Sequence, residues 1–282
     1  MSTVQSIINK PITIPKESTV NDVIKELMNK KISRLLVSEG DKCTSIITEK
    51  DVGLFLLNDS TERNLNQIPI SEIMKPLLWI SSSPSLKECA NTMYENSIGS
   101  LAINTDGTID GIVTKTDLVR SFAENFSGKK IVGEYATLYY AWAYSDTPIY
   151  KVVRKMIDEK ISRIILKSHD ELPEGILTFR DLFRIALEEG NVKEIADTTI
   201  PDISIVFTRK GFLSETGFGA TTIAKQIMTD KIISVRYDDD LAKACNLLLD
   251  YKINAVGVLS NKGRLVGILS KTDVTRAIAF MN

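Results

Sequence analysis

A seven-residue pattern occurs four times along the 282-residue chain, and each copy ends in aspartate. The copies read SIITEKD, GIVTKTD, GILTFRD and GILSKTD, and their last residues are Asp51, Asp117, Asp181 and Asp273. Three positions before each aspartate stands a hydroxyl residue: Thr48, Thr114, Thr178 and Ser270. Such recurrence indicates a chain built from structural repeats. We call the terminal aspartates anchors and number the repeats one to four.

The same succession of predicted elements surrounds each anchor. An amphipathic helix, with apolar residues three and four positions apart, is followed by a short strand rich in β-branched residues. These strands begin at Ile32, Ile98, Ile161 and Ile253. A polar or glycine-bearing turn leads to the anchor motif, and a second helix starts near the anchor. Each repeat is therefore predicted as strand, helix, strand, turn, strand and helix, which indicates an α/β fold.

The size of a repeat predicts that repeats pair. A unit of about sixty residues leaves an apolar face of its sheet exposed, and a second unit can bury that face. We expect two pairs, with a boundary near residues 127–129. The predicted repeats span residues 1–60, 61–126, 127–190 and 191–282. The last includes an inserted linker, 202–222, whose glycines do not form the pattern of a phosphate-binding P-loop.

Composition and charge exclude several classes of protein. Apolar residues make up 43% and charged residues 25% of the chain, as in ordinary globular proteins. The formal net charge of −1 provides no general attraction to nucleic acid or to a membrane surface. The chain has no apolar run long enough for a transmembrane helix, and its N-terminus lacks the layout of a signal peptide. We therefore expect a cytoplasmic protein.

Residues suited to catalysis or to metal binding are few. The only histidine, His169, lies in a polar turn, and Cys43, Cys89 and Cys245 form no CxxC pair. Cys89 and Cys245 stand among apolar helical positions, which favours buried and unreactive thiols. This set is too small for a structural zinc site, and no cysteine lies near His169 in sequence. We expect neither enzymatic activity nor a metal requirement.

The anchor motif has two interpretations. A hydroxyl and a carboxylate three residues apart form a capping-box pattern, so the four copies could serve only to cap helices. The start of a helix also offers free N–H groups and positive dipole to a phosphate. A hydroxyl there can donate to phosphate, and a carboxylate can accept the two hydroxyls of a ribose. Residue types alone leave both interpretations open.

Four in-register copies of this strand–[Thr/Ser]-x-x-Asp–helix signature resemble the CBS domain, whose pairs are called Bateman modules. The resemblance covers nearly the whole chain and implies four CBS repeats in two Bateman modules that form a pseudo-symmetric disc. The third repeat, with VGEYATLYYAWAYSDTPIYKVV, is similar to the gamma subunits of AMP-activated protein kinases. The family implies a regulatory protein that binds AMP, or else ADP or ATP, and signals to an unidentified partner protein. The sequence leaves homodimerisation open.

The resemblance also implies roles for single residues. The four anchors would bind ribose, and Thr48, Thr114, Thr178 and Ser270 would bind ribose or phosphate. Arg34 and Arg163, at matching places in the middle strands, would bind phosphate, with a solvated surface arginine as the equal alternative. Ile32, Ala141 and Ile161 would border the adenine. A sensor of S-adenosyl compounds and a ligand-free interaction scaffold are the alternative functions.

Some positions depart from the pattern or have weaker support. Ser45 stands where the other copies have Gly111, Gly175 and Gly267, so we expect a less close backbone approach in repeat one. Weaker candidates for phosphate binding are Lys31, Lys50, Lys160, Arg180 and Lys271, because charges beside a helix start are usually solvated.

Overall fold

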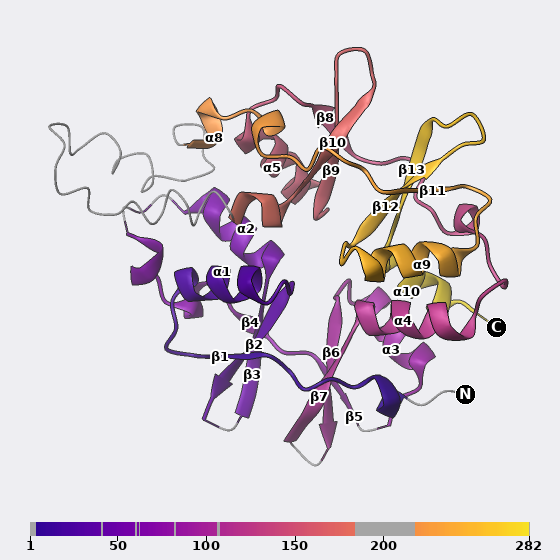
Figure 1. Ribbon diagram of the computed structural model, residues 1–282. Helices are drawn as coiled ribbons and strands as arrows, with labels where there is room; N and C mark the ends of the chain where they lie inside the picture. The colour runs from indigo at the N-terminus through magenta and orange to yellow at the C-terminus, as the bar shows by residue number, and fades with distance from the viewer. Residues whose placement is uncertain are drawn as a thin grey trace, which may run out of the picture. The chain divides into compact units, whose positions relative to one another are not determined.

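The computed structural model describes residues 4–40, 42–59, 61, 63–81, 83–105, 108–183 and 218–281. The chain forms two compact units (Figure 1). The first unit consists of Met1–Pro11, Leu77–Tyr140 and Ile232–Asn282, and the second consists of Ile12–Pro76 and Ala141–Lys231. Repeats two and four thus share the first unit, and repeats one and three share the second.

The described elements have the predicted order. Repeat one comprises β1 (Thr13–Pro15), α1 (Val20–Asn29), β2 (Arg34–Glu39), β3 (Lys42–Thr48) and α2 (Glu49–Asn58). Repeat two comprises β5 (Trp79–Ser81), α3 (Leu86–Glu95), β6 (Ser100–Thr105), β7 (Thr108–Thr114) and α4 (Lys115–Asn125). Repeat four comprises β11 (Ser234–Arg236), α9 (Leu241–Asp250), β12 (Ala255–Leu259), β13 (Leu265–Ser270) and α10 (Lys271–Ala279).

Repeat three is described up to the start of its second helix. Its elements are β8 (Trp142–Tyr144), α5 (Ile149–Asp158), β9 (Arg163–Lys167) and β10 (Pro173–Thr178). The following helix is described from Phe179 to Phe183. Of the predicted linker 202–222, the described end contains the short helix α8 (Phe218–Thr221), and residues up to 217 lie outside the described ranges.

Every repeat contains a small sheet with the middle strand between the other two. The first strand is parallel to the middle strand, and the last strand is antiparallel to it, as in the order β5-β6-β7. The intervening helix provides the crossover that a parallel pair requires. In repeat one the two-residue strand β4 (Lys75–Pro76) adds to the edge of β3, which gives this sheet four strands.

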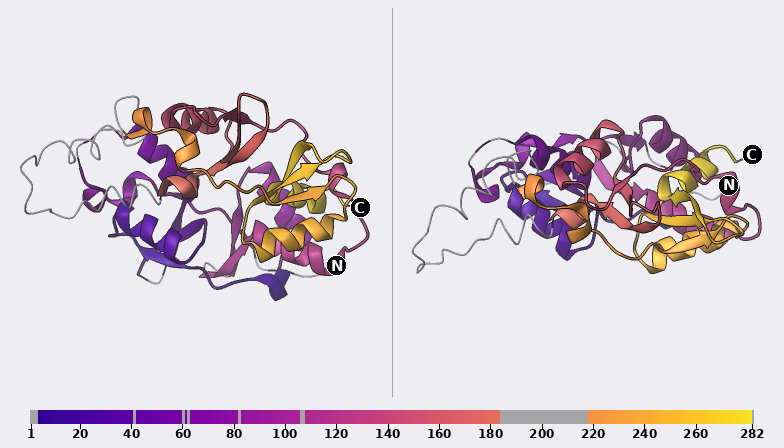
Figure 2. Two further views of the ribbon diagram at one scale, coloured as in Figure 1. Left: turned by 45° about the horizontal axis from the view of Figure 1, so that its top comes forward. Right: turned by 90° about the horizontal axis from the view of Figure 1, so that it is seen from above.

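Helices join the two repeats inside each unit. In the first unit α10 packs against α3 and α4, and α4 lies beside α9 (Figures 1 and 2). Cys89 and Cys245 belong to this core, and burial raises the pKa of each thiol to about 12. This confirms the prediction that both thiols are buried.

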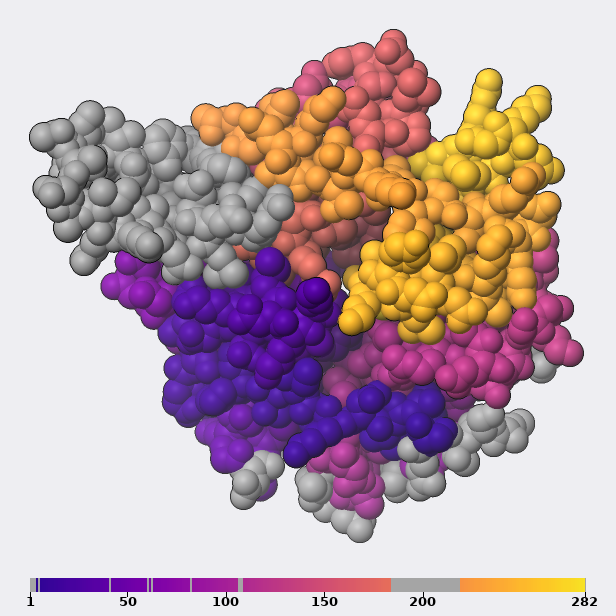
Figure 3. Space-filling view, viewed as in Figure 1, coloured from indigo at the N-terminus to yellow at the C-terminus, as the bar shows by residue number. Residues whose placement is uncertain are grey.

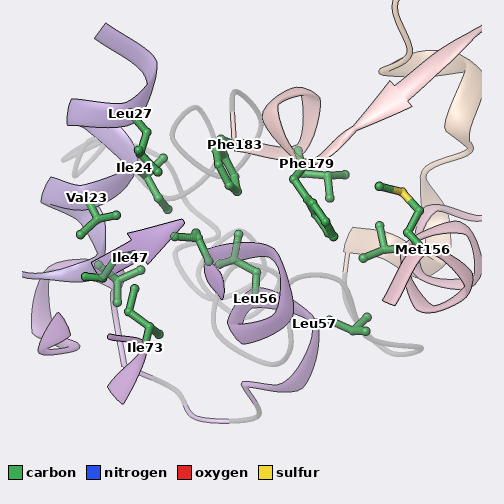
Figure 4. Packing of buried hydrophobic residues seen from close by; sticks show 14 of the residues in the cluster. Val23, Ile24, Leu27, Ile47, Leu56, Leu57, Ile73, Met156, Phe179 and Phe183 are labelled. Atoms are coloured by element: carbon green, nitrogen blue, oxygen red, sulfur yellow. The ribbon is translucent and has the colours of Figure 1, made fainter. Parts of the chain in front are cut away.

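The core of the second unit joins repeats one and three in the same manner. Leu56 and Leu57 of α2 and Phe179 of repeat three all belong to one apolar cluster (Figure 4). A Cβ atom at Gly53 of α2 would lie 2.2 Å from the Phe179 ring, so this glycine permits the close packing. Alternate repeats thus share a core, and consecutive repeats are connected in another way, described below.

The first helix of every repeat is followed, two residues after its end, by a residue in the left-handed conformation. Lys31, Ser97, Lys160 and Lys252 have φ angles of 53°, 54°, 57° and 52°. Glycine usually occupies this position, because it adopts positive φ without a steric penalty. Lys31 and Lys160, two of the weaker phosphate candidates, therefore have a structural role in ending a helix.

Replacement of Lys252 by glycine is expected to stabilise the fold by about 1 kcal/mol, the cost of a left-handed conformation in a residue that has a Cβ atom. The neighbouring Tyr251, with φ of −84°, is the matched control. Tyr251→Gly is expected to destabilise the fold, since its backbone is helical. Urea unfolding of both variants measures the difference. A destabilised Lys252→Gly variant would contradict this account of the helix end.

Candidate functional site

All four anchors cap the helix that they begin. One oxygen of each carboxylate, Oδ2, accepts a hydrogen bond from the backbone N–H of the hydroxyl residue three positions earlier, at 2.7–2.9 Å. The same oxygen accepts the hydroxyl itself, at 2.5–2.7 Å. The capping interpretation of the motif is therefore confirmed for the carboxylate, and it occupies one of the two carboxylate oxygens.

A fifth capping box in the chain shows what capping alone requires. Thr19 and Asp22 at the start of α1 have the same contacts, at 2.9 Å from N–H and 2.7 Å from hydroxyl to Oδ2. The Thr19 hydroxyl lowers the pKa of Asp22, whose side chain is half-buried. By contrast, Asp51, Asp117 and Asp273 are 6%, 4% and 7% exposed. Burial of a carboxylate is costly, and capping does not require it.

Four short segments that precede the repeats contact the anchors. We call them lead-ins, and they are residues 4–9, 70–75, 132–137 and 224–229. Each begins with a buried apolar residue in a 3-10 turn, namely Val4 in η1 (Val4–Ile7), Ile70 in η3 (Ile70–Glu72), Val132 in η4 (Val132–Glu134) and Ala224 in η5 (Ala224–Gln226). Each ends beside an anchor, with Asn9, Lys75, Thr137 and Thr229 as the last residues.

Every lead-in lies on the last strand of its consecutive neighbour. Asn9, ahead of repeat one, pairs with Ile112 of repeat two, and Lys75, ahead of repeat two, pairs with Ile46 of repeat one. The two lead-ins of the second half are exchanged in the same way, as Thr137 pairs with Ile268 and Thr229 with Ile176. Figure 3 shows the N-terminal segment, in indigo, on the magenta surface of repeat two. This exchange connects consecutive repeats.

The glycines of the anchor motif provide room for the lead-ins. A Cβ atom at Gly111 would lie 2.9 Å from the carbonyl oxygen of Asn9, and one at Gly175 would lie 2.6 Å from that of Thr229. At Gly267 the corresponding distance to Thr137 is 2.7 Å. Backbone atoms cannot rotate away, so these positions require glycine. Ser45, the departure in repeat one, lies opposite Pro76 of β4.

The second oxygen of each anchor, Oδ1, faces the last residue of a lead-in. Asn9 Nδ2 donates to Asp117 at 2.9 Å, and the hydroxyls of Thr137 and Thr229 donate to Asp273 and Asp181 at 3.2 and 3.3 Å. Lys75 Nζ lies 2.5 Å from Asp51. The sequence-based prediction of the site included none of these four residues. Their signal is a spacing of five positions from a buried apolar residue, repeated before each first strand.

The predicted phosphate residues lie next to the anchor hydroxyls. Arg34 of β2 is the register partner of Thr48, and Arg163 of β9 is the register partner of Thr178. Antiparallel partners have their side chains close together on the same face of a sheet. The structure thus brings each arginine to the anchor of its own repeat, and their role in phosphate binding stays a prediction.

Two of the five weaker cationic candidates, Arg180 and Lys271, bond to other side chains. Arg180 forms an ion pair with Glu49, with its Nε 2.8 Å from Oε1. Lys271 donates to the hydroxyl of Thr116 at 3.0 Å. Burial lowers the pKa of Lys50, and the charge of Lys75 lowers it further.

The predicted adenine-bordering residues share one environment. Ile32, Ala141 and Ile161 are all half-buried and pack against the core of the second unit. Ile32 and Ile161 stand just before β2 and β9, two residues ahead of Arg34 and Arg163. Contact with a base stays a prediction for all three.

His169 lies apart from the anchors. Its Nε2 is 2.8 Å from Asp146 Oδ2, this hydrogen bond raises the pKa of His169, and its ring stacks on Tyr144. The turn that holds His169 precedes β10, whereas the anchor motif ends that strand. Among the described residues, no cluster of three His, Cys, Asp or Glu side chains could hold a metal ion. No helix in the described ranges has the length and apolarity to cross a membrane.

Comparison with known proteins finds the same repeats. The family model of the CBS domain matches residues 4–57, 70–124, 132–188 and 224–280. Protein MJ1225 of Methanocaldococcus jannaschii is 22% identical over 96% of either chain. A protein from the ribosomal RNA operon of Thermofilum pendens is 22% identical over 93% of this chain and 85% of its own length.

Solved structures share the fold. The crystal structure of MJ1225, described as a candidate archaeal homologue of the gamma subunit of AMP-activated protein kinase, has a TM-score of 0.80 at 20% identity and covers 99% of this chain and 100% of its own. A conserved protein of Pyrococcus horikoshii has a TM-score of 0.63 at 17% identity over 98% of this chain and 100% of its own. The arrangement of repeats is thus common to several archaeal chains.

Proposed function

Because the chain belongs to the CBS-domain family, we propose that it binds an adenine nucleotide, AMP first, and regulates a partner protein through a ligand-dependent change of conformation. The proposal rests on one observation above all. Three of the four anchors, Asp51, Asp117 and Asp273, are buried, and all four direct a second oxygen at a lead-in, an arrangement that the capping box of Asp22 does without. A ribose diol is a ligand that can use that oxygen.

Repeats three and four offer the best anchors for ribose. Their lead-in residues, Thr229 and Thr137, are neutral hydroxyls at 3.3 and 3.2 Å from Asp181 and Asp273. A hydroxyl both donates and accepts, so it can exchange its bond to the carboxylate for a bond to a ligand hydroxyl. We therefore propose that the anchors of the second half bind nucleotide more tightly than those of the first.

The small number of cationic side chains beside the anchors favours a nucleoside monophosphate as the ligand. Arg180 is paired with Glu49, and Arg120 and Arg276 lie 3.0 and 3.4 Å from the anchors Asp117 and Asp273. Arg34 and Arg163 stand in register with the anchor hydroxyls Thr48 and Thr178, one in each half of the chain. A single arginine can bind one phosphate through two hydrogen bonds, whereas a triphosphate carries more charge than it balances.

The lead-ins would couple nucleotide binding to the conformation of the chain. A nucleotide at an anchor would contact the segment that leads into the neighbouring repeat, so binding would restrain that connection. A ligand shifts a conformational equilibrium only as far as it binds one state more tightly. We propose that the partner protein recognises the chain with its lead-ins restrained.

One observation favours a second function. The carboxylate of each anchor caps its helix without any ligand, so the four motifs can be explained by folding alone. A scaffold of repeats that binds other proteins and no nucleotide would need nothing further from these residues.

Isothermal titration with AMP, ADP, ATP and S-adenosylmethionine at fixed salt separates the two functions. We expect saturable binding of AMP, weaker binding of ATP, and a rise in melting temperature with AMP through preferential binding to the folded state. Absence of heat and of any melting shift with all four compounds would favour the scaffold.

A further inference from the structure

Repeat one has the only charged residue among the four lead-in ends. Asn9, Thr137 and Thr229 present neutral groups to their anchors, whereas Lys75 presents an ammonium group to Asp51. The four positions are equivalent in the fold, since each is the sixth residue of a lead-in that begins with a buried apolar residue.

Both oxygens of Asp51 are engaged, as at the other anchors, but here the lead-in engages the second oxygen with a cation. Oδ2 accepts the N–H and the hydroxyl of Thr48, and Oδ1 lies 2.5 Å from Lys75 Nζ. The Asp51 side chain is only 5% exposed, whereas the Lys75 side chain is 57% exposed, so the carboxylate is shielded from water and the lysine reaches it from the surface. A charge-assisted bond of this kind is stronger than a bond from a neutral hydroxyl.

The cation that contacts Asp51 comes from a different segment than the cations at the other anchors. In repeats two and four the cation is an arginine three positions after the anchor, Arg120 or Arg276, on the same helix. Repeat one has Leu54 at that position. Its cation comes from the lead-in, which is the side where the other anchors meet neutral hydrogen-bonding groups.

The strand β4 holds Lys75 in place. Lys75 and Pro76 pair with two successive residues of β3, Ile46 and Ser45, whereas each other lead-in forms a single bridge with its strand. The additional pairing restrains the backbone from which Lys75 extends. Withdrawal of Lys75 from Asp51 would therefore have to occur by side-chain rotation alone.

We propose that Lys75 closes the anchor of repeat one to a ribose diol, so that the chain has fewer nucleotide sites than anchors. This inference rests on the proposed function, because it concerns which anchors take the nucleotide. A ribose would have to displace an ammonium group from a buried carboxylate, which leaves that charge with weaker partners. Lys75 is thereby a residue that determines site occupancy.

The test rebuilds the arrangement of repeat four in repeat one. The double variant Lys75→Thr/Leu54→Arg places a threonine at the lead-in end and an arginine one turn after Asp51. Isothermal titration with AMP is expected to show one more site per chain than the unmodified protein. Lys75→Asn, which imitates Asn9, is a second opening variant should the double variant not fold. Lys16→Thr, which removes the surface ion pair of Lys16 with Glu39, is the matched control and is expected to leave the number of sites unchanged.

The outcomes separate this inference from the proposed function. If the unmodified chain binds AMP and neither folded opening variant gains a site, Lys75 does not close the anchor. Gain of a site with Lys16→Thr as well would also overturn the inference, since the effect would then be one of charge alone. If the unmodified chain and all variants bind nothing, both the inference and the proposed function are wrong.

Discussion

Replacement of Asp273 by asparagine is expected to weaken AMP binding by about tenfold to a hundredfold. Hydrogen bonds to a charged group contribute about 1.5–3 kcal/mol, and 1.4 kcal/mol corresponds to a tenfold change in affinity. Asparagine keeps one oxygen that can accept the N–H of Ser270, now at 2.8 Å from Asp273, so the helix start is conserved. Titration calorimetry on the folded variant, with circular dichroism as a check, measures the loss.

The control for this variant is Asp22→Asn. It weakens a capping box with the same geometry on α1, whose carboxylate accepts the backbone N–H and the hydroxyl of Thr19. Both variants are expected to lose about 1 kcal/mol of stability or less from the weakened cap. Only Asp273→Asn is expected to lose affinity. Equal affinities in the two variants would show that the anchor is a cap and no more.

Replacement of Gly267 by alanine is expected to destabilise the first unit by about 1–3 kcal/mol, the usual cost of overpacking. The new Cβ atom would lie 2.7 Å from the carbonyl oxygen of Thr137 and 3.3 Å from Cα of Leu138. Relief requires the lead-in to move away from β13, and the Thr137 hydroxyl would then move away from Asp273. We expect a lower urea midpoint and weaker AMP binding in the same variant.

Ser45→Gly in repeat one is the reverse substitution and serves as the control. The lead-in there already tolerates a side chain at this position, so removal of the side chain relieves no clash. The expected change is a loss of about 1 kcal/mol or less, from the greater flexibility of glycine in a strand. A Gly267→Ala variant as stable as Ser45→Gly would contradict the tight contact with Thr137.

Local patterns predict much of this fold. Apolar periodicity locates α1, α3, α5 and α9. The recurring motif places the last strand of each repeat correctly, and the second helix of repeats one, two and four, because both depend on neighbours in sequence. The pairing of Arg34 with Thr48 does not follow from the length of the hairpin, because a register shift between Val37 and Ser38 displaces the pairing by one residue. The predicted anchors and hydroxyls prove to be bonded to each other in all four copies.

Local patterns do not predict contacts between residues far apart in sequence. The lead-ins are short and carry no strand or helix periodicity, so nothing local shows that Thr229 reaches Asp181. The partner of Arg180 is Glu49, a residue of another repeat, and that contact depends on the packing of α2 in the second unit. The charge of Lys31 and Lys160 suggests phosphate ligands, whereas in the structure both residues have the left-handed backbone conformation that follows a helix.

The exchange of lead-ins has a consequence for how such a chain can be divided. The polypeptide passes from one unit to the other after residues 11, 76, 140 and 231, so neither unit is a continuous stretch of sequence. A fragment ending after α2 would lose β4 and expose the edge of β3 to pairing with other chains. The smallest piece that can keep both of its anchors covered is two consecutive repeats with their lead-ins, and any duplication or truncation that preserves the sites must respect that length.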